Sequence, residues 1–347
     1  MRCLRASLAL AFCVAALAVG CETPASDAPP GESAPAPTAE AQSALAALPA
    51  ETRFLAVADV QALRQGGIFD RKNASDLSGE AGARLRAFLD ATGFGPAEDV
   101  RKVYLAAGGE ALGGDASGDS AAMPLQMAVA ADFDRARFEE ELSSELGDRF
   151  EKSTYRSQPV YRSTRGGGNA EEQRAFAFTA DGLIFLSTRA GVRQMLDRLE
   201  TDGSAADSDR LMTLADRVRG RGSTWFVAQD LPPGATVEQA GGNSGSSSAG
   251  GAPPQRFQRL QQVVRDAVGA VSVLDRNAEG EVFLYTQEGA APGDLREVLE
   301  GLVSAAGRSG DVSEQRQRLL DSIEIEEADD QSVRVTFSAP LDGQGGG

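Results

Sequence analysis

The feature that most constrains the fold is a recurring order of short apolar segments and amphipathic helical segments over most of the chain. The apolar segments have the length of β-strands, and two of them are joined by the turn residues Asp181 and Gly182. The helical segments carry large apolar residues at helical spacing, as Val192, Leu196 and Leu199 do. We therefore predict an α+β fold in which antiparallel sheets carry helices packed on one face.

The predicted elements form two halves. In the first half the pattern predicts strands at residues 53–58, 100–107, 125–133, 159–161, 176–179 and 183–187, and helices at 59–63, around 85–89, at 134–146 and at 192–199. In the second half it predicts strands at 224–229, 270–274, 281–286, 323–326 and 333–338, and helices at 257–267, 294–307 and around 319–320. Each half therefore reads strand-helix-strand-strand-helix-strand, with an extra hairpin strand at the end, which is the order of ferredoxin-like, split β-α-β units. The alternative is one irregular α+β domain around a large antiparallel sheet.

A run of apolar residues near the start of the chain follows two arginines and ends at Cys21. This arrangement predicts a secretory signal, because about a dozen apolar residues are too few to remain as a membrane-spanning helix. Its last four residues, Ala18-Val19-Gly20-Cys21, resemble the lipobox of bacterial lipoproteins. The resemblance implies cleavage between Gly20 and Cys21 and attachment of lipid to the Cys21 thiol. The globular part resembles envelope lipoproteins of unassigned function.

The cysteines of the chain support the same interpretation. The chain has three, and Cys3 and Cys13 lie within the segment that cleavage would remove. An exported protein usually carries paired cysteines or none, so a single remaining thiol at Cys21 is accounted for if its sulfur is already joined to the lipid as a thioether. We expect a protein of the cell envelope, anchored by lipid and facing the periplasm or the cell surface. The alternative is an ordinary signal peptide with an incidental cysteine.

Composition and pattern together predict the domain organisation. Residues 22–47 are rich in Pro, Ala, Ser and Thr, and cannot bury enough apolar surface to offset the entropy of ordering. The predicted organisation is a signal peptide at 1–20, a disordered tether at 21–48, a first α+β half at 49–200, a linker and helix at 201–222, a second α+β half at 223–340 with a disordered insertion at 237–254, and a flexible tail at 341–347.

The charge of the chain limits its partners. Lysine and arginine number 34 against 51 aspartates and glutamates, which gives a formal net charge of −17. Such a surface repels nucleic acid and anionic lipid headgroups, so we expect no nucleic-acid partner and expect membrane contact through the lipid on Cys21. The sequence does not identify a protein or ligand partner.

The chain contains no histidine, which excludes whole classes of site. Without histidine there is no Ser-His or Cys-His nucleophile pair, and no zinc or non-haem iron site that uses an imidazole ligand. Any acid–base chemistry would depend on carboxylates, tyrosine or lysine. We expect no catalytic residue, no metal site and no cofactor, and therefore a protein that is not an enzyme.

Several polar and glycine-rich segments imitate known sites. Asp115, Ser117 and Asp119 have the spacing of a calcium loop, but the loop glycine and the final glutamate are missing, so a polar hairpin loop is the better interpretation. The glycines at 166–168 lack the Lys-Ser/Thr of a phosphate-binding loop and predict a hairpin connection. A dense acidic run predicts a solvated hairpin tip, with weak cation binding as the alternative; its members are Glu324, Glu326, Glu327, Asp329 and Asp330.

Two further features are expected to be structural. Arg217, Arg219 and Arg221 form the most basic short stretch, and in so acidic a chain we expect them to pair with neighbouring carboxylates. Trp225, the one tryptophan, begins an apolar strand and is expected in the core.

Three classes of function are consistent with these observations. The leading hypothesis is a non-enzymatic binding or scaffolding module held at the envelope by its lipid. A carrier of a lipid or other hydrophobic ligand is the first alternative, and it predicts an apolar pocket lined by Phe176, Phe178, Phe185 and Met195. A carboxylate-dependent hydrolase is the second alternative, and it predicts two carboxylates converging in a cleft.

Overall fold

The computed structural model describes residues 38–66, 94–108, 125–146, 150–164, 173–201, 203–231, 259–260, 262–274, 277–307 and 314–340. The chain divides into two compact units, with the main division between Met212 and Thr213. The first unit comprises residues 35–107 and 124–212. The described residues of the second unit lie between 213 and 340, together with Gly108.

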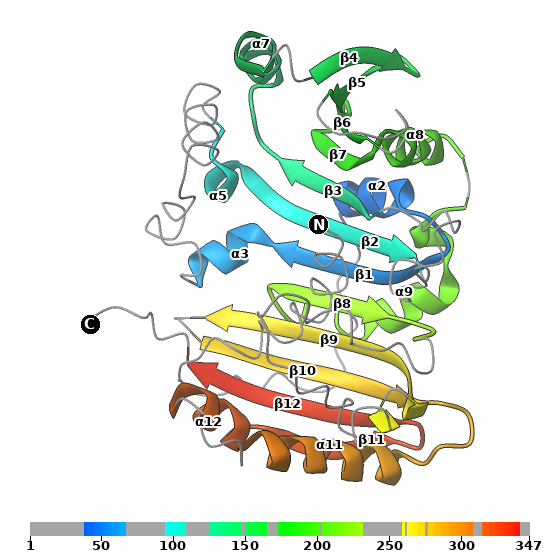
Figure 1. Ribbon diagram of the computed structural model, residues 1–347, viewed down its shortest axis with the longest axis vertical. Coiled ribbons are helices and arrows are strands. Elements are labelled where there is room, and N and C mark those ends of the chain that lie inside the picture. Colours follow the sequence, from blue (N-terminus) through cyan, green and yellow to red (C-terminus); the bar gives the residue numbers. More distant parts are fainter. Residues whose placement is uncertain are drawn as a thin grey trace, which may run out of the picture. The chain divides into compact units, whose positions relative to one another are not determined.

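The first unit is built on an antiparallel sheet with the strand order β1-β2-β3-β7-β6-β5-β4 (Figure 1). Its strands are β1 (Thr52–Asp59), β2 (Val100–Gly108), β3 (Gln126–Ala131), β4 (Phe150–Tyr155), β5 (Gln158–Ser163), β6 (Arg174–Phe178) and β7 (Leu183–Thr188). Its helices are α2 (Ala39–Ala47), α3 (Val60–Gln65), α5 (Pro96–Asp99), α7 (Arg135–Leu146) and α8 (Arg189–Arg198), with a short 3-10 turn at Ala205–Asp207.

One face of this sheet packs against α7. Phe178 of β6 lies opposite Ile184 of β7, and both belong to a buried cluster with Leu142 of α7. Phe138 of α7 meets the Phe178 ring edge-on, with the ring centroids 5.5 Å apart. The sheet face beneath α7 is therefore filled by large side chains.

The opposite face packs against α2 and α8, which contact each other (Figure 1). Ala128 of β3 lies opposite Phe185 of β7 on this face, and Gln126 stands two residues before Ala128. The Gln126 amide donates to Gln194 of α8 over 3.4 Å, which places α8 on this side. The prediction that helices cover only one face is wrong for this unit, because strands with apolar residues on both sides must be buried on both.

The strands of the second unit are also antiparallel, with the order β8-β9-β10-β12-β11. Its strands are β8 (Thr224–Ala228), β9 (Val264–Leu274), β10 (Asn277–Thr286), β11 (Glu324–Asp329) and β12 (Ser332–Pro340). The helices α11 (Pro292–Gly307) and α12 (Glu314–Asp321) pack along β11 and β12 (Figure 1). Helix α9 (Asp209–Asp216) contains the division between the units.

Two glycines let aromatic rings lie directly on the second sheet. A Cβ atom at Gly269 of β9 would stand 2.6 Å from Cε1 of Phe226, and one at Gly280 of β10 would overlap the Phe337 ring. Gly280 and Phe337 are direct partners in the β10–β12 pairing. Each ring therefore fills the space that a side chain would have taken, which is how aromatic residues compensate for glycine in strands.

The predicted α+β class and its antiparallel pairing are confirmed, but the ferredoxin-like arrangement is wrong. In a split β-α-β unit the two strands that flank a helix are separated by a third strand. Here β1 and β2 are neighbours, and β3 is followed by a meander of four strands whose last member, β7, returns to pair with it. Pairing partners are set by contacts between distant parts of the chain, which the order of elements alone does not fix.

Three elements also differ from the prediction in their presence or their bounds. Helix α2 lies inside the predicted tether, and its Ala44, Leu45 and Ala47 are buried, so the tether cannot extend to residue 48. Strand β4 was not predicted, because Phe-Glu-Lys-Ser-Thr-Tyr has little apolar character. The helix predicted at 257–267 extends too far, because β9 already begins at Val264.

Several predicted features lie outside the described residues. They are the signal peptide at 1–20 with Gly20 and Cys21, the tether before residue 38, the helix around 85–89, the loop with Asp115 and Asp119, the glycines at 166–168, the insertion at 237–254 and the tail at 341–347. The predicted hairpin at residues 180–182 is confirmed: β6 and β7 pair across it, and Gly182 has a positive φ of 78°.

Candidate functional site

A cluster of aromatic rings lies on the α7 side of the first unit. Phe178 is its centre and is 1% exposed. Its ring centroid lies 5.4 Å from that of Phe133 and 5.8 Å from that of Tyr161. Tyr161 in turn stacks on Phe176 at 4.9 Å with the ring planes 11° apart. Below we call this group, which also includes Phe94, Phe138 and Phe150, the aromatic cluster.

The four side chains expected to line a carrier pocket do not share a cavity. Phe178 pairs with Ile184, whereas Phe185 pairs with Ala177, so Phe178 and Phe185 point to opposite faces of the sheet. Met195 of α8 is fully buried on the Phe185 side. The prediction of one apolar pocket lined by these four side chains, which would have favoured a hydrophobic-ligand carrier, is therefore wrong.

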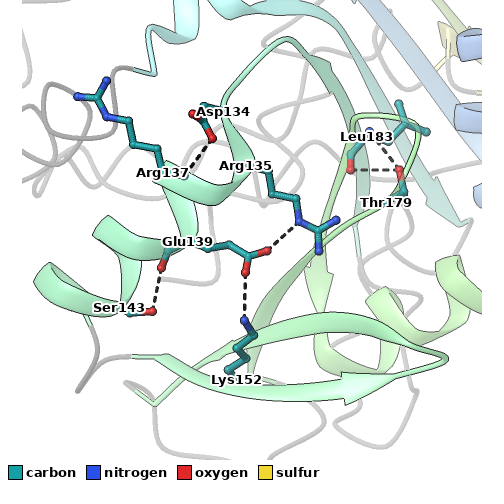
Figure 2. Close-up of polar contacts among 8 residues, drawn as sticks. All are labelled: Asp134, Arg135, Arg137, Glu139, Ser143, Lys152, Thr179 and Leu183. Atoms are coloured by element: carbon teal, nitrogen blue, oxygen red, sulfur yellow. Dashed lines mark hydrogen bonds and ion pairs between the residues drawn. The ribbon is translucent and has the colours of Figure 1, made fainter.

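Charged side chains lie over rings of the aromatic cluster. The Glu139 carboxylate of α7 accepts from Arg135 Nε at 2.8 Å and from Lys152 Nζ at 3.0 Å (Figure 2). The Arg135 guanidinium lies 5.5 Å from the Phe178 ring centroid, and Lys152 Nζ lies 5.3 Å from that of Tyr161. Both cations therefore face aromatic rings while they bind one carboxylate.

The position of Glu139 follows from the start of α7. Asp134 accepts from the Arg137 backbone N–H at 3.1 Å and so caps the first turn, while Ser143 Oγ donates to the Glu139 carbonyl oxygen at 2.8 Å (Figure 2). Partial burial opposes ionisation of Glu139, but the hydrogen bonds from Arg135 and Lys152 outweigh it and lower the pKa of its carboxyl. Burial raises the pKa of the Tyr161 phenol. The Glu139 carboxylate, with Arg135 and Lys152 bound to it, is therefore suited to holding α7 on the sheet.

A second charged arrangement crosses the second unit's sheet. Glu281 of β10 is bound by Arg221 at 2.9 Å and by Arg334 of β12 at 3.3 Å. Arg334 also binds Glu326 of β11 at 3.0 Å, so alternating charges span three neighbouring strands. The Arg217 guanidinium lies over two rings of β10, 5.3 Å from the centroid of Tyr285 and 5.9 Å from that of Phe283. We call Glu281, Arg221, Arg334 and Glu326 the ionic ladder.

The basic stretch and the acidic run both form ion pairs, and one pair joins them to each other. Arg217 binds Asp329 at 3.4 Å and Arg219 binds Asp216 at 2.5 Å, which confirms that these arginines pair with carboxylates. Glu327 of the acidic run binds Arg296 of α11 at 3.6 Å. Over the part of the chain that the structure describes, no group of three or more His, Cys, Asp or Glu side chains could hold a metal ion. Trp225 is 8% exposed, so its predicted place in the core is confirmed.

Two buried polar groups escaped the sequence analysis. Asp266 is 1% exposed; its carboxylate accepts from the Asp230 backbone N–H at 3.0 Å and from Arg265 Nε at 2.9 Å. Asp230 has a positive φ of 49°, so Asp266 fixes the unusual backbone that ends β8. Gln126 is fully buried and accepts from Arg198 at 3.4 Å. The only signal in the sequence was a polar residue inside an apolar strand.

A third polar group ties the β4–β5 hairpin to α8. The Tyr155 hydroxyl donates to Asp197 at 2.9 Å, and Arg156 binds both Asp197 and Glu200. The Arg193 guanidinium lies 5.2 Å from the Tyr155 ring centroid. Arg156 and Ser157, the two turn residues, have positive φ angles of 46° and 63°.

Comparisons with known proteins assign no family. No family model matches the chain, and no curated protein does. Crystal form III of TP0453, a Treponema protein, aligns with a TM-score of 0.49 and 9% identity over 86% of this chain and 94% of that chain. Crystal form I of the same protein gives a TM-score of 0.48, also with 9% identity, and covers 86% and 93% of the two chains. A similarity this distant assigns no function.

The predicted anchor residues, Gly20 and Cys21, stand before the first described residue, so no contact of either is known. Among the helices that the structure describes, none is both long and apolar enough to cross a membrane.

Proposed function

We propose that this chain is a lipid-anchored protein of the cell envelope that acts as a non-enzymatic binding or scaffolding module. The observation that carries the proposal is Ala18-Val19-Gly20-Cys21 at the end of a signal-like segment, in a chain that has no cysteine after Cys21. A lone thiol in an oxidising compartment is open to oxidation, and a thioether bond to the lipid removes the free thiol. Attachment through Cys21 would place the protein on the periplasmic or outer face of an envelope membrane.

The distance between the proposed anchor and the folded part fits this role. Thr38 caps α2 by accepting from the Ala41 backbone N–H at 3.3 Å, and it stands about 17 residues after Cys21. At about 3.1 Å per residue, an extended segment of that length would reach roughly 50 Å from the membrane. That reach is enough to clear the headgroup region while keeping the first unit close to it.

The chemistry of the charged clusters supports a module without catalytic groups. Glu139 and Glu281 each bind two cationic side chains, and Asp329 binds Arg217. Carboxylates engaged in this way hold neighbouring elements together, and the chain has no histidine that could act with them. A binding or scaffolding role uses the surface of such a fold and needs no reacting group.

The proposal is tested by labelling bacteria that express the full chain with a radioactive fatty acid. The parent protein should incorporate label, and Cys21→Ser should lose it and accumulate as a precursor that retains its leader. Cys13→Ser, which lies inside the leader, is the matched control and should be labelled like the parent. Label that persists in Cys21→Ser, or a parent that takes up none, would overturn the lipid anchor.

A further inference from the structure

Strands β4 and β11, which stand at the two ends of the strand order, differ in how well they are protected. β11 has the sequence Glu-Ile-Glu-Glu-Ala-Asp, and its pairing with β12 shifts register between Glu327 and Asp329. Charge and irregular register are the devices by which edge strands avoid pairing with other chains. β4, Phe-Glu-Lys-Ser-Thr-Tyr, carries one charge of each sign and pairs with β5 in unbroken register along its whole length. β4 is therefore the less protected edge.

The turn determines which backbone groups of β4 face outward. Residues that flank a two-residue turn exchange hydrogen bonds, and here Tyr155 and Gln158 flank Arg156 and Ser157. Hydrogen-bonded and non-bonded pairs then alternate along the hairpin. Pro159, which has no N–H, falls opposite Thr154 in a non-bonded pair, as this assignment requires.

It follows that Ser153 directs its backbone groups toward Val160 of β5, and its hydroxyl also donates to the Val160 carbonyl at 3.3 Å. The backbone N–H and C=O groups of Phe150, Lys152 and Thr154 point away from β5, to the side on which no described strand pairs with β4. These three residues present the donors and acceptors that an added strand would need.

We propose that β4 is an interface with a second copy of this chain, which adds its own β4 in antiparallel orientation with Ser153 opposite Ser153 on the two-fold axis. In an antiparallel pair, residues opposite each other share a face, so a symmetric pairing must be centred on a residue. Centring on Lys152 would place two ammonium groups opposite each other, and centring on Glu151 would do the same with two carboxylates. Centring on Ser153 avoids both clashes.

The Ser153-centred register also gives the outward backbone groups of β4 hydrogen-bond partners. It places Lys152 opposite Thr154 of the other copy, so that these two residues exchange backbone hydrogen bonds, about four over the whole interface. It places Glu151 opposite Tyr155, whose ring lies under Arg193. The Glu151 side chain is 54% exposed and the Lys152 side chain is 56% exposed, so both can adjust to a partner. The pairing extends the sheet and leaves the aromatic cluster intact.

Cysteine cross-linking tests both the interface and its register. Opposed residues of a non-bonded antiparallel pair have Cα atoms about 4.5 Å apart, within the range that a disulfide spans. The full chain, purified with its anchor in mild detergent, should give a reducible dimer from Ser153→Cys under mild oxidation. Lys152→Cys and Thr154→Cys should each give little dimer alone and much more when the two are mixed. The parent chain is the control for links through Cys21.

Each outcome bears on the proposal. A reducible dimer from Ser153→Cys, with the mixed pair linking and the single variants not, supports it. A dimer from Lys152→Cys with none from Ser153→Cys would overturn the register. No cross-link from any β4 variant would overturn the interface. Sedimentation experiments provide a second measurement, in which Ser153→Asp should weaken self-association at least tenfold. Glu324→Lys on β11 is the control and should leave self-association unchanged. Equal self-association of the two variants would also overturn the proposal.

Discussion

The two units bury their sheets by different means. The first unit has apolar residues on both faces of its sheet, covered by α7 on one side and by α2 and α8 on the other. The second unit is apolar on the face covered by α11 and α12, where aromatic rings lie on glycines. Its opposite face carries the ionic ladder. A sheet with one charged face can remain in contact with water, but a sheet with two apolar faces cannot. We therefore expect the stability of the first unit to depend mainly on buried apolar area. The stability of the second unit should depend more on how closely its rings pack on the glycines.

The largest effect is expected from Phe178→Ala in the aromatic cluster. Phe178 contacts Phe133, Phe138, Tyr161 and Phe176, so its removal leaves a cavity among rigid rings that cannot close around it. A cost of about 3–5 kcal/mol in the free energy of unfolding is expected. Denaturant unfolding with hydrogen exchange would measure it, and the faster exchange should concentrate in β3, β6 and β7.

The matched control is Phe283→Ala on the second sheet. Phe283 is half-buried and packs under the Arg217 guanidinium, so its loss should cost about 1–2 kcal/mol. If the two variants lost equal stability, the contrast between the units would not hold.

The second unit should respond most to a change at its glycines. Gly280→Ala places a methyl group where the Phe337 ring lies, so the ring or the strand must shift. An overpacking cost of about 1–3 kcal/mol is expected, most of it recovered in the double variant Gly280→Ala with Phe337→Leu. Thermal unfolding followed by the fluorescence of Trp225, the one tryptophan of the chain, reports on this unit.

Gly293→Ala at the start of α11 is the control for that experiment. Its added Cβ would meet Glu327 Oε1 at 3.6 Å, which is ordinary contact, and alanine favours a helix over glycine. We expect no loss, and a gain of up to about 1 kcal/mol. A loss at Gly293 as large as that at Gly280 would mean that the ring contact is not what matters.

How far the sequence could predict this fold depends on how local each feature is. The runs at β1, β2, β8 and β12 were predicted because apolar residues gather in short segments there. β4 was missed because an edge strand is half solvated and needs few apolar residues. Helix α2 was missed because it is rich in alanine, and its burial depends on contact with β3 and α8.

The candidate sites follow the same rule. The pairing of Arg217, Arg219 and Arg221 with carboxylates was predictable from composition, since acidic residues are in excess. The assignment of Phe178 and Phe185 to one pocket failed because it ignored strand parity: odd and even positions in a hairpin point to opposite faces. The ionic ladder and the Glu139 group depend on strands and helices distant in sequence, which no short pattern reveals.

Acid should weaken both units through carboxylates with lowered pKa values. Cation contacts hold the pKa of Glu139 below its ordinary value despite burial, and hydrogen bonds from Gln331, Ser332 and Arg217 do the same for Asp329. A lowered folded-state pKa means that the unfolded chain binds the proton more readily. Such stability is present at pH 7, begins to fall near the ordinary pKa (4.5 for Glu139 and 3.8 for Asp329), and is lost once the pH passes below the folded-state pKa.

The variants Glu139→Gln and Asp329→Asn separate these contributions. At pH 7, Glu139→Gln should cost up to about 1 kcal/mol, because the carboxylate is shielded and binds two cations. Its difference from the parent should shrink as the pH is lowered from 5 toward 3. Asp329→Asn should cost less, because its side chain is 41% exposed. A pH-independent difference for Glu139→Gln would show that its shape, rather than its charge, holds α7 in place.

The smallest effect is expected at the β4–β5 turn, where the first unit uses non-glycine residues in a left-handed conformation. Ser157 has a φ of 63°, which L-residues adopt at a cost and glycine adopts freely. Ser157→Gly should therefore raise the melting temperature slightly, for a gain of about 0.5–1 kcal/mol. Thr154→Gly, in the extended part of β4, should lose a similar amount. Arg156→Asn should be close to neutral, because relief of its φ of 46° is offset by loss of the contacts to Asp197 and Glu200. If Arg156→Asn stabilised the protein as much as Ser157→Gly, those ion pairs would contribute nothing.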